Sequence, residues 1–384
     1  MLAISSLLII SCQKNTRDIV PDQTGVAEEN SSLSEESARH GGDNQEGYVY
    51  TATNEPSGNK IKVFKRGSDG RLTYQSSFAT GGNGTGGGLG NQGGMILLED
   101  GGTLLVVNAG SNSVSSLKIV GNGNLVLKST VSSEGTTPVS IALHDNLVYI
   151  LNSGGDGNIA GFKLGSNDKL TYLSNSTRPL TSTSSGAAQV SFVRNGSVLA
   201  ITEKATNKIV TYRVSESGRP FGMKSITSAN TTPFGFASGR FGNIYVSEAA
   251  GGAAGASTLS SYHISYNGTI SLADGPVSAN QSAACWVVLT DNGKYAYTTN
   301  TASNNISSFN VNSYSGNLSV LNATAATSGM GPIDAALSNN SKFLYVLNSG
   351  SKSISAYKVM YNGNLDFIET TTGLPMGANG LAAR

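Results

Sequence analysis

Residues 332–365, PIDAALSNNSKFLYVLNSGSKSISAYKVMYNGNL, carry four short β-strand signals in series. Apolar, aromatic and β-branched runs are separated by polar groups such as Ser338-Asn339-Asn340 and Asn348-Ser349-Gly350, a pattern typical of strands joined by tight turns. A unit of four strands has two faces to bury and cannot close a core alone. It therefore has to stack against copies of itself.

Copies of this unit can be traced by the end of the second strand. A strand signal that ends in Asn or Glu recurs at Asn54, Asn108, Asn152, Glu203, Glu248, Asn300 and Asn348. The spacing of about 44 to 54 residues is the period of a four-stranded propeller blade. Seven such strand ends predict an all-β fold, a seven-bladed β-propeller.

The ends of the repeat region predict how the ring closes. The first repeat begins at Gly47 and has no inner strand before Tyr48, whereas residues 379–384 resemble an inner strand with nothing after it. If this C-terminal strand joins the N-terminal blade, no long sheet edge stays open. Residues 47–384 are thus expected to form one closed propeller.

Composition agrees with many tight turns and narrows the possible partners. The 384 residues include 48 Gly, and 13% of the residues are charged. This combination argues against disorder and against a helical solenoid. The net charge of +1 comes from 25 basic and 24 acidic residues that are scattered along the chain, so we expect no nucleic-acid partner.

The N-terminal region predicts a membrane anchor. An apolar run precedes Cys12; it is too short to span a bilayer as a helix and has the length of a signal-peptide core. Its last residues and Cys12, IISC, resemble a bacterial lipobox, which implies that residues 1–12 are a lipoprotein signal peptide ending in a lipidated Cys12. Residues 13–46 are too polar to fold and are predicted to be a disordered tether. We therefore expect a lipid-anchored monomer of the cell envelope, held at the outer membrane or cell surface.

Cysteine and histidine exclude several kinds of site. With Cys12 lipidated, Cys285 has no disulfide partner, and the lack of a nearby His indicates a buried, inert thiol. His40 lies in the tether, His144 in an opposite-face turn and His263 on a third strand. No cluster has metal-ligand spacing and no Ser lies in a G-x-S-x-G elbow, so we expect no metal and no other cofactor.

Strand direction predicts which residues can contact a ligand. In a propeller, the starts of the inner strands and the ends of the second strands share one face. Ligand sites lie where the inner ends converge. Around this channel mouth the sequence places Gly93, Gly94, Pro138, Gln189, Phe234, Trp286, Asp334 and Asn379.

Two carboxylates are the catalytic candidates. At five second-strand ends Asn is ordinary turn chemistry. Glu203 and Glu248 replace it on adjacent blades, where they could serve as a general base and its electrostatic partner. Alternatively, Glu203 pairs with Lys204 or Lys208, and Glu248 caps the small-residue loop that follows it.

Four inner-strand residues are the ligand-binding candidates. Gln189 and Asn379 could orient a ligand through their amides. Trp286 either stacks on a ring-shaped ligand in the channel or is ordinary core between blades. Asp334 either meets the ligand or pins neighbouring blades through a hydrogen bond.

Two loops break the repeat near the predicted mouth. Residues 80–94, TGGNGTGGGLGNQGG, lack the Lys-Ser/Thr ending of a phosphate-binding loop, so a phosphate site is not expected. This loop is either a lid over the channel or a slack linker. Residues 249–256, AAGGAAGA, are small and leave room beside Glu248.

The repeats carry a family resemblance. The segments PIDAALSNNSKFLYVLNSGSKSISAYKV, AACWVVLTDNGKYAYTTNTASNNISSFNV, PVSIALHDNLVYILNSGGDGNIAGFKL and AQVSFVRNGSVLAITEKATNKIVTYRV resemble the seven-bladed lactonase-like propellers, the family of the propeller-type 6-phosphogluconolactonases and carboxymuconate lactonizing enzymes. The resemblance implies a His, Glu and Arg site on the channel face. Glu203 matches the acid, Gln189 and Trp286 stand where the His would be sought, and Arg194 and Arg213 are the available arginines.

Two functions follow from these observations. The resemblance implies hydrolysis of a lactone or related cyclic ester outside the cytoplasm, with a small-molecule lactone or carbohydrate-like ligand at the mouth. The alternative is a non-catalytic cell-surface propeller for ligand binding or scaffolding, because YTTNTASNNISSFNV also resembles surface-protein repeats of the Tyr-Val-Thr-Asn type. Exposed acids with perturbed pKa values at the mouth would favour the enzyme.

Overall fold

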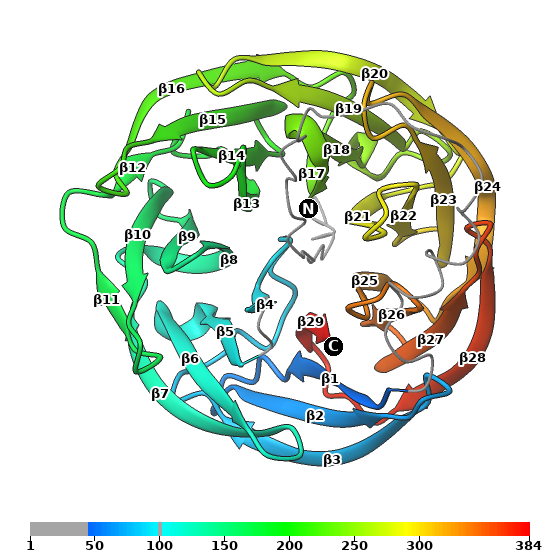
Figure 1. Ribbon diagram of the computed structural model, residues 1–384, viewed down its shortest axis with the longest axis horizontal. Helices are drawn as coiled ribbons and strands as arrows, with labels where there is room; N and C mark the ends of the chain where they lie inside the picture. The colour runs from blue at the N-terminus through cyan, green and yellow to red at the C-terminus, as the bar shows by residue number, and fades with distance from the viewer. Residues whose placement is uncertain (1–44, 99–101) are drawn as a thin grey trace, which may run out of the picture.

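The computed structural model describes residues 45–98 and 102–384, whose strands form seven antiparallel sheets around a central axis (Figure 1). The sheets are named blades 1 to 7 in ring order. The predicted signal peptide, Cys12 and all but the last two residues of the tether lie outside the described residues. No helix among the described residues is long and apolar enough to cross a membrane.

Each blade is given from its inner to its outer strand. Blade 1 contains β29 (Asn379–Ala383), β1 (Gly47–Ala52), β2 (Lys60–Arg66) and β3 (Leu72–Ala79). Blade 2 contains β4 (Met95–Leu97), β5 (Thr103–Asn108), β6 (Ser113–Val120) and β7 (Asn124–Ser132). Blade 3 contains β8 (Thr136–His144), β9 (Leu147–Gly154), β10 (Asn158–Leu164) and a split outer strand, β11 (Leu170–Tyr172) and β12 (Arg178–Pro179).

The other four blades have four strands each. Blade 4 contains β13 (Ala187–Val193), β14 (Val198–Glu203), β15 (Lys208–Val214) and β16 (Pro220–Thr227). Blade 5 contains β17 (Pro233–Ser238), β18 (Asn243–Glu248), β19 (Thr258–Ile264) and β20 (Ile270–Ser278). Blade 6 contains β21 (Ala284–Leu289), β22 (Tyr295–Asn300), β23 (Asn305–Val311) and β24 (Leu318–Thr327), and blade 7 contains β25 (Pro332–Leu337), β26 (Phe343–Asn348), β27 (Ser353–Val359) and β28 (Leu365–Thr372). Three short 3-10 turns, η1 (Ala109–Ser111), η2 (Arg240–Gly242) and η3 (Ala250–Gly252), complete the structure.

The predicted closure of the ring is confirmed. β29 pairs antiparallel with β1, with Val49 opposite Ala383. Beyond the paired strands, Tyr48 and Arg384 exchange backbone hydrogen bonds at 3.2 and 2.9 Å, and the guanidinium of Arg66 donates to the Arg384 carbonyl. The C-terminal strand therefore supplies the missing inner strand of blade 1 and covers the edge of β1.

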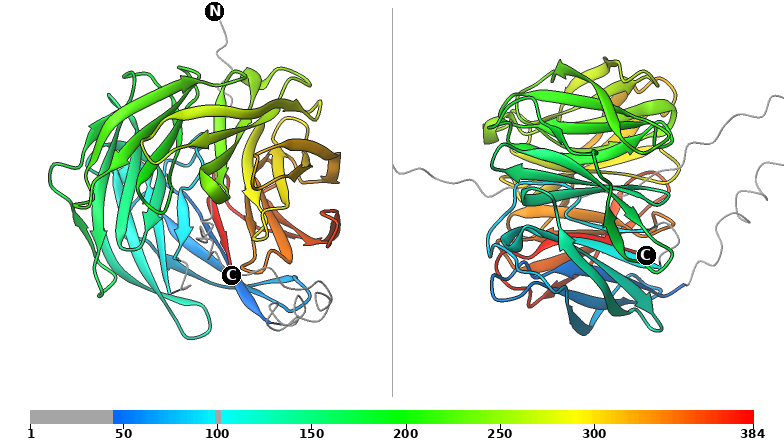
Figure 2. Two further views of the ribbon diagram at one scale, coloured as in Figure 1. Left: turned by 45° about the horizontal axis from the view of Figure 1, so that its top comes forward. Right: turned by 90° about the vertical axis from the view of Figure 1, so that its left-hand side faces the viewer.

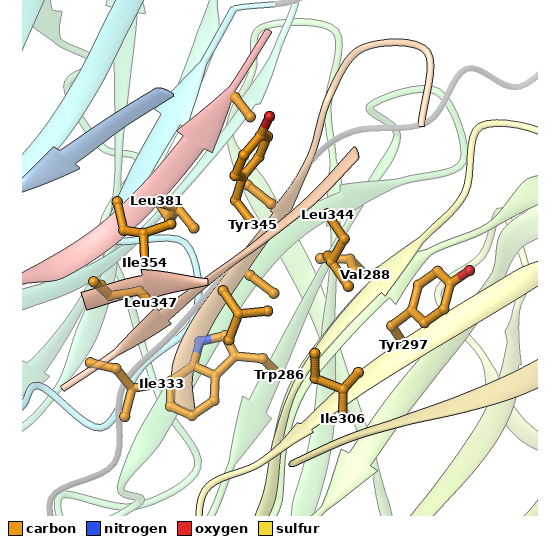
Figure 3. Packing of buried hydrophobic residues seen from close by; sticks show 14 of the residues in the cluster. Trp286, Val288, Tyr297, Ile306, Ile333, Leu344, Tyr345, Leu347, Ile354 and Leu381 are labelled. Carbon is orange, nitrogen blue, oxygen red and sulfur yellow. The ribbon is translucent and has the colours of Figure 1, made fainter. Parts of the chain in front are cut away.

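Burial explains why these sequences form blades. The second strands β5, β14, β18 and β26 are buried at every residue, because a neighbouring blade covers each of their faces. Outer strands such as β3 alternate between exposed and covered residues instead. The core thus lies between adjacent blades, as Figure 3 shows for Trp286, Leu344, Tyr345 and Leu347.

Tyrosines on the second strands fasten one blade to the next. In three blades a second-strand tyrosine hydroxyl donates a hydrogen bond to a glycine carbonyl in the turn between the third and fourth strands of the following blade. The three pairs are Tyr149 with Gly218 at 2.6 Å, Tyr297 with Gly363 at 3.0 Å and Tyr345 with Gly70 at 2.8 Å. These turns lie on the face opposite the second-strand ends.

Candidate functional site

The seven second-strand ends lie on one face of the ring, and all seven side chains are buried. The asparagines bond mainly within their own blade. Asn300 Nδ2, for example, donates to Asn305 Oδ1 at 2.7 Å and to Ser307 Oγ at 2.8 Å. Only Asn54 among the seven has a left-handed backbone, so most of these amides join strands rather than form the turn itself.

The left-handed turn residue lies four positions after several of these strand ends. Asn112, Asn207 and Asn304 have φ angles of 51°, 54° and 55°. Each side-chain oxygen accepts an N–H from the start of the next blade, and the donors are Thr137, Thr232 and Gly331, each at 2.7–2.8 Å. This face of the ring is therefore fastened blade to blade.

Glu203 ends β14 and is fully buried. Its Oε1 accepts the Thr181 N–H at 2.9 Å, and its Oε2 accepts the hydroxyls of Thr181 and Thr206, the latter at 2.6 Å. The carboxylate thus ties the segment arriving from blade 3 to the turn that follows β14. The expected ion pairs with Lys204 and Lys208 do not form.

Glu248 ends β18 and is held by more donors than Glu203. Its oxygens accept hydrogen bonds from the side chains of Ser228, Thr258, Ser260 and Tyr262 at 2.6–3.0 Å and from the Asn230 N–H at 3.1 Å. Proximity to this carboxylate adds to burial in raising the pKa of Tyr262 to about 12. Among the described residues, no hydrogen bond joins Glu248 to Glu203.

The glycine-rich loop after β3 enters the central channel. We call its last residues, 90–94, the plug. The Gln92 N–H donates to the Ala188 carbonyl at 2.8 Å, and its Nε2 donates to the carbonyls of Phe236 and Val287 at 3.3 and 3.1 Å. One residue therefore contacts the inner strands of blades 4, 5 and 6. Figure 1 shows the chain before β4 crossing toward the centre of the ring.

The plug uses backbone groups that the inner strands leave unpaired. An inner strand has one edge that faces the channel rather than another strand. Near the start of β8 and of β13, a β-bulge interrupts the pairing with the second strand, so a backbone carbonyl there is left without a partner in the sheet. Asn91 Nδ2 donates to the bulged Val139, and Gln92 N–H to the bulged Ala188. Gly235 lets the Gln92 side chain approach, because a Cβ there would collide with Gln92 Oε1. The loop is therefore not a slack linker in this region, because its last residues are hydrogen-bonded to the inner strands of blades 3 to 6.

Gln189 and Asn379 lie at the channel, as predicted, but both bind protein groups. Gln189 exchanges two hydrogen bonds with the backbone of Phe236, at 2.6 and 3.0 Å. Asn379 Nδ2 donates to Asn91 Oδ1 of the plug at 3.3 Å. Both side chains are buried, so they join blade 4 to blade 5 and the closing strand to the plug.

Trp286 and Asp334 lie in the interior between the inner strands. Trp286 is fully buried, and its ring centroid lies 5.2 Å from that of Phe234. Figure 3 shows the indole beside Ile333 and Leu347 of blade 7, and its Nε1 has no hydrogen-bond partner. Asp334 on β25 is also fully buried. Neither side chain presents surface to solvent.

Lys204 is a residue that sequence reasoning considered only as a partner for Glu203. It follows β14 on the mouth face, and its Nζ donates to the Gly90 carbonyl of the plug and lies 4.7 Å from the Phe234 ring centroid. Burial lowers its pKa to about 8, and no carboxylate pairs with it in the described part of the chain. Its signal in the sequence was its position, since a residue directly after a second strand faces the mouth.

Cys285 and His263 make no hydrogen bond to Glu203 or Glu248 in the described part of the chain. Cys285 is buried, and burial raises the pKa of its thiol to about 12. His263 lies on the opposite face between Asn243 and Arg194, and burial together with the Arg194 charge lowers its pKa. Within residues 45–98 and 102–384 no group of His, Cys, Asp and Glu could hold a metal ion.

Comparison with solved structures shows the same fold. A protein of unknown function from Desulfotomaculum acetoxidans matches with a TM-score of 0.70 and 14% identity over 88% of this chain and 98% of that one. A Bacteroides uniformis protein assigned provisionally as a 6-phosphogluconolactonase matches with a TM-score of 0.68 and 19% identity over 88% and 99%. The periplasmic gluconolactonase of Pseudomonas aeruginosa matches with a TM-score of 0.64 and 17% identity over 87% and 99%.

No curated protein sequence matches this chain. A family model does: residues 246–378, from the middle of β18 to the residue before β29, match the family described as lactonase, 7-bladed beta-propeller. The match spans the last part of blade 5 and all of blades 6 and 7, and it supports the resemblance to lactonase-like propellers that the repeats indicate.

Proposed function

We propose that the protein hydrolyses a lactone or a related cyclic ester, outside the cytoplasm, at the mouth face of the ring. The match to the lactonase family model supports this activity. Two structures of the same fold carry names of lactonases, one of them a periplasmic gluconolactonase and the other a provisionally assigned 6-phosphogluconolactonase. The observation in this chain that carries the proposal is Lys204, an amine of lowered pKa over an aromatic ring at the mouth.

Lys204 has the chemistry that the reaction requires. With a pKa of about 8, part of the population is neutral near physiological pH, and a neutral amine can take a proton from water. The activated water attacks the lactone carbonyl, the ring C–O bond breaks, and the departing alkoxide is protonated to give a hydroxy acid. The Gly90 carbonyl and the Phe234 face hold the amine in place before the substrate arrives.

In this proposal the two glutamates act through structure. The Glu203 carboxylate accepts from Thr206 in the turn that also contains Lys204, so in this proposal Glu203 positions the amine through that turn. Direct action of Glu203 as the base would require the loss of its bond to Thr206 or Thr181. Glu248 is held by five donors, so proton transfer by this carboxylate is less favourable still.

A second candidate is a non-catalytic surface propeller for ligand binding or scaffolding. The filled hydrogen-bond networks of both carboxylates and the plugged channel favour it. An enzyme that had lost its channel-face chemistry would keep the ring and the plug for stability alone. The same experiment separates the two functions.

The test measures acid release by the purified full-length protein in a pH-stat, with a panel of γ- and δ-lactones from pH 6.5 to 9. We expect turnover that rises as the pH passes about 8 and that is lost in Lys204→Met. Lys208→Met, four residues further along the chain, is the matched control and should retain the rate. Glu203→Gln should lower the rate only in part.

Two results would contradict the proposal. Rates equal to the uncatalysed hydrolysis across the panel, from protein with an unchanged melting temperature, would favour the non-catalytic propeller. Turnover that survives in Lys204→Met but disappears in Glu203→Gln would move the base to Glu203, as the sequence alone suggested.

The location is also part of the proposal, and it rests on the N-terminal sequence. A lipid on Cys12 would hold the ring in the cell envelope, where extracellular or periplasmic lactones are available. Mass spectrometry of the mature N-terminus tests this directly. An unmodified Cys12, or an uncleaved Met1, would remove the anchor from the proposal.

A further inference from the structure

The face opposite the mouth carries the turns between the third and fourth strands. In six blades this turn has four residues and closes with a hydrogen bond from its last N–H to its first carbonyl, at 2.7–3.2 Å. The second residue of the turn is then the one most exposed by geometry. In ring order from blade 1, skipping blade 6, these residues are Ser68, Asn122, Ser166, Glu216, Tyr266 and Tyr361.

Tyrosine occupies this turn in three consecutive blades. Tyr266 is in blade 5, Tyr361 is in blade 7, and Tyr314 is at the centre of the one-residue-longer turn of blade 6. Their exposed fractions are 61%, 92% and 80%, so core packing does not account for the choice of a large aromatic residue. We call these three tyrosines the tyrosine arc. The blade 2 turn, Gly121-Asn122-Gly123, has no aromatic residue either.

Contacts from the preceding blade hold two rings of the arc, those of Tyr266 and Tyr314, and the backbone of Tyr361. The guanidinium of Arg194 in blade 4 lies 4.8 Å from the ring centroid of Tyr266. Phe241 of blade 5 packs edge-on against Tyr314, with ring centroids 5.6 Å apart. In blade 6, the hydroxyl of Tyr295 donates to the Tyr361 carbonyl at 3.3 Å. Ordered rings lose less entropy on binding a ligand.

The turns that carry the arc contain amides and no charged residue, and Arg194 is the one cation in the described structure that lies over a ring of the arc. The turns 265–268, 312–316 and 360–363 contain Asn267, Asn312 and Asn362 and no charged residue. The corresponding turns of blades 1, 3 and 4 contain Asp69, Asp168 and Glu216. Blades 5 to 7 therefore present flat apolar rings beside neutral hydrogen-bonding groups.

We propose that the tyrosine arc is a binding surface for a neutral glycan chain. Sugar rings have apolar C–H faces that stack on aromatic rings and hydroxyls at their edges that bond to amides and phenols. Three platforms on successive blades suit a chain of repeating rings better than a single small molecule. The surface lies on the face opposite the second-strand ends and Lys204, and it does not depend on the lactonase proposal. The right-hand view of Figure 2 shows the ring from its side.

Other macromolecules fit this chemistry less well. An anionic polymer would need a cluster of lysines and arginines, whereas the three turns contain none and Arg194 alone lies over a ring of the arc among the described residues. A peptide partner would bind best in a groove that buries an apolar anchor, whereas these rings stand at 61–92% exposure on separate turns.

The experiment is isothermal titration of the full-length protein with chitohexaose, cellohexaose and xylohexaose, beside an alginate hexamer and phosphatidylcholine vesicles. The test variant combines Tyr266→Ser, Tyr314→Ser and Tyr361→Ser. The three replaced side chains are exposed, so their removal opens no cavity in the core. Tyr74→Ser, which removes a half-exposed tyrosine from an outer strand, is the matched control. We expect saturable binding of at least one neutral hexamer, weakened more than about tenfold in the triple variant and roughly threefold by each single change.

Retained affinity in Tyr74→Ser and an unchanged melting temperature of the triple variant would complete the support. Absence of binding to every neutral hexamer would overturn the proposal. So would equal binding by the wild type and the triple variant, or a tyrosine-dependent binding confined to the alginate or to the vesicles. Lactone turnover of the triple variant should stay at the wild-type rate, so a failure of one proposal is distinguishable from a failure of the other.

Discussion

Glu248 and Asn300 occupy the same place in adjacent blades and show two ways of fastening a strand end. Asn300 donates from its amide to Asn305 and Ser307 of the third strand. Glu248 can only accept, and it is surrounded by five donors, including Ser228 and the Asn230 N–H in the segment arriving from blade 4. The repeat places a polar side chain at the same strand end in each blade, and the surrounding groups are donors or acceptors according to which residue is there.

Glu203 is intermediate between the two. It accepts from Thr181 in the arriving segment and from Thr206 in the following turn, and the lysine beside it has no carboxylate partner in the described chain. The comparison teaches that a carboxylate replacing a turn former in a repeat is not by itself a catalytic group. The hydrogen-bond donors around the carboxylate determine its role. Here they indicate a structural role for Glu248 and a positioning role for Glu203.

The largest effect is expected for Glu248→Ala, which leaves several buried donors without an acceptor. We expect a loss of about 3–5 kcal/mol in the free energy of unfolding, measured by urea denaturation. Glu248→Gln should lose less, because one oxygen remains as an acceptor. Glu216→Ala, at an exposed turn, is the control and should change stability by less than about 0.5 kcal/mol. Wild-type stability in Glu248→Ala would show that the network contributes nothing.

A smaller loss is expected for Glu203→Ala, because this carboxylate accepts from three donors rather than five. The unfolding free energy should fall by about 2–3 kcal/mol. Amide hydrogen exchange should also accelerate at Thr181, whose N–H loses its acceptor. Unchanged protection at Thr181 would contradict the role assigned to Glu203.

Replacement of the asparagine at the strand end of blade 6 should lower the free energy of unfolding by a still smaller amount. Asn300→Ala removes two neutral hydrogen bonds, and we expect a loss of about 1–2 kcal/mol in the same denaturation assay. Asn300→Asp is the informative companion variant, because a carboxylate there would face the acceptor oxygen of Asn305 and should be less stable at pH 7 than at pH 4. A pH-independent Asn300→Asp variant would argue that the donor pattern does not matter.

The smallest effect concerns Lys204 and depends on pH. Its folded-state pKa is about 8, below the ordinary value of 10.5, because burial disfavours the charged amine. The cost of the buried charge is thus present in full below about pH 8 and is relieved as the pH rises from 8 to 10.5. The free energy of unfolding of Lys204→Met should exceed that of the wild type by about 1 kcal/mol at pH 7, and this difference should shrink toward pH 10. A difference between the two proteins that is constant with pH would show that Lys204 titrates normally.

The ring itself could be predicted from the sequence. Strand runs ending in Asn or Glu recur with a blade-length period, and each predicted end is the last residue of a second strand, apart from Asn54 and Asn152, which lie two residues beyond and before their strand ends. Closure by Asn379–Ala383 followed from the missing inner strand before Tyr48, and it is confirmed. These features are local and periodic, so neighbouring residues are sufficient to show them.

The candidate site was less predictable. The sequence brought Gln189, Trp286 and Asn379 to the inner strands of the ring, but it could not show what fills the channel beside them. A glycine-rich segment has no side-chain pattern to indicate its path, and Gln92 finds its partners Phe236 and Val287 more than a hundred residues away. The plug is therefore a property of the assembled ring.

The sequence by itself determined the number of blades, their order, the closing strand and the face on which the strand ends gather. Only the tertiary structure decided that Glu203 and Glu248 are held by donors, that the channel is plugged and that Lys204 stands at the mouth without a carboxylate. The physical reason is that periodicity and turn chemistry act between residues close in the chain. The hydrogen-bond partners of a buried side chain depend instead on which segments the fold brings within bonding distance, and for Lys204 and Gln92 these lie more than a hundred residues away.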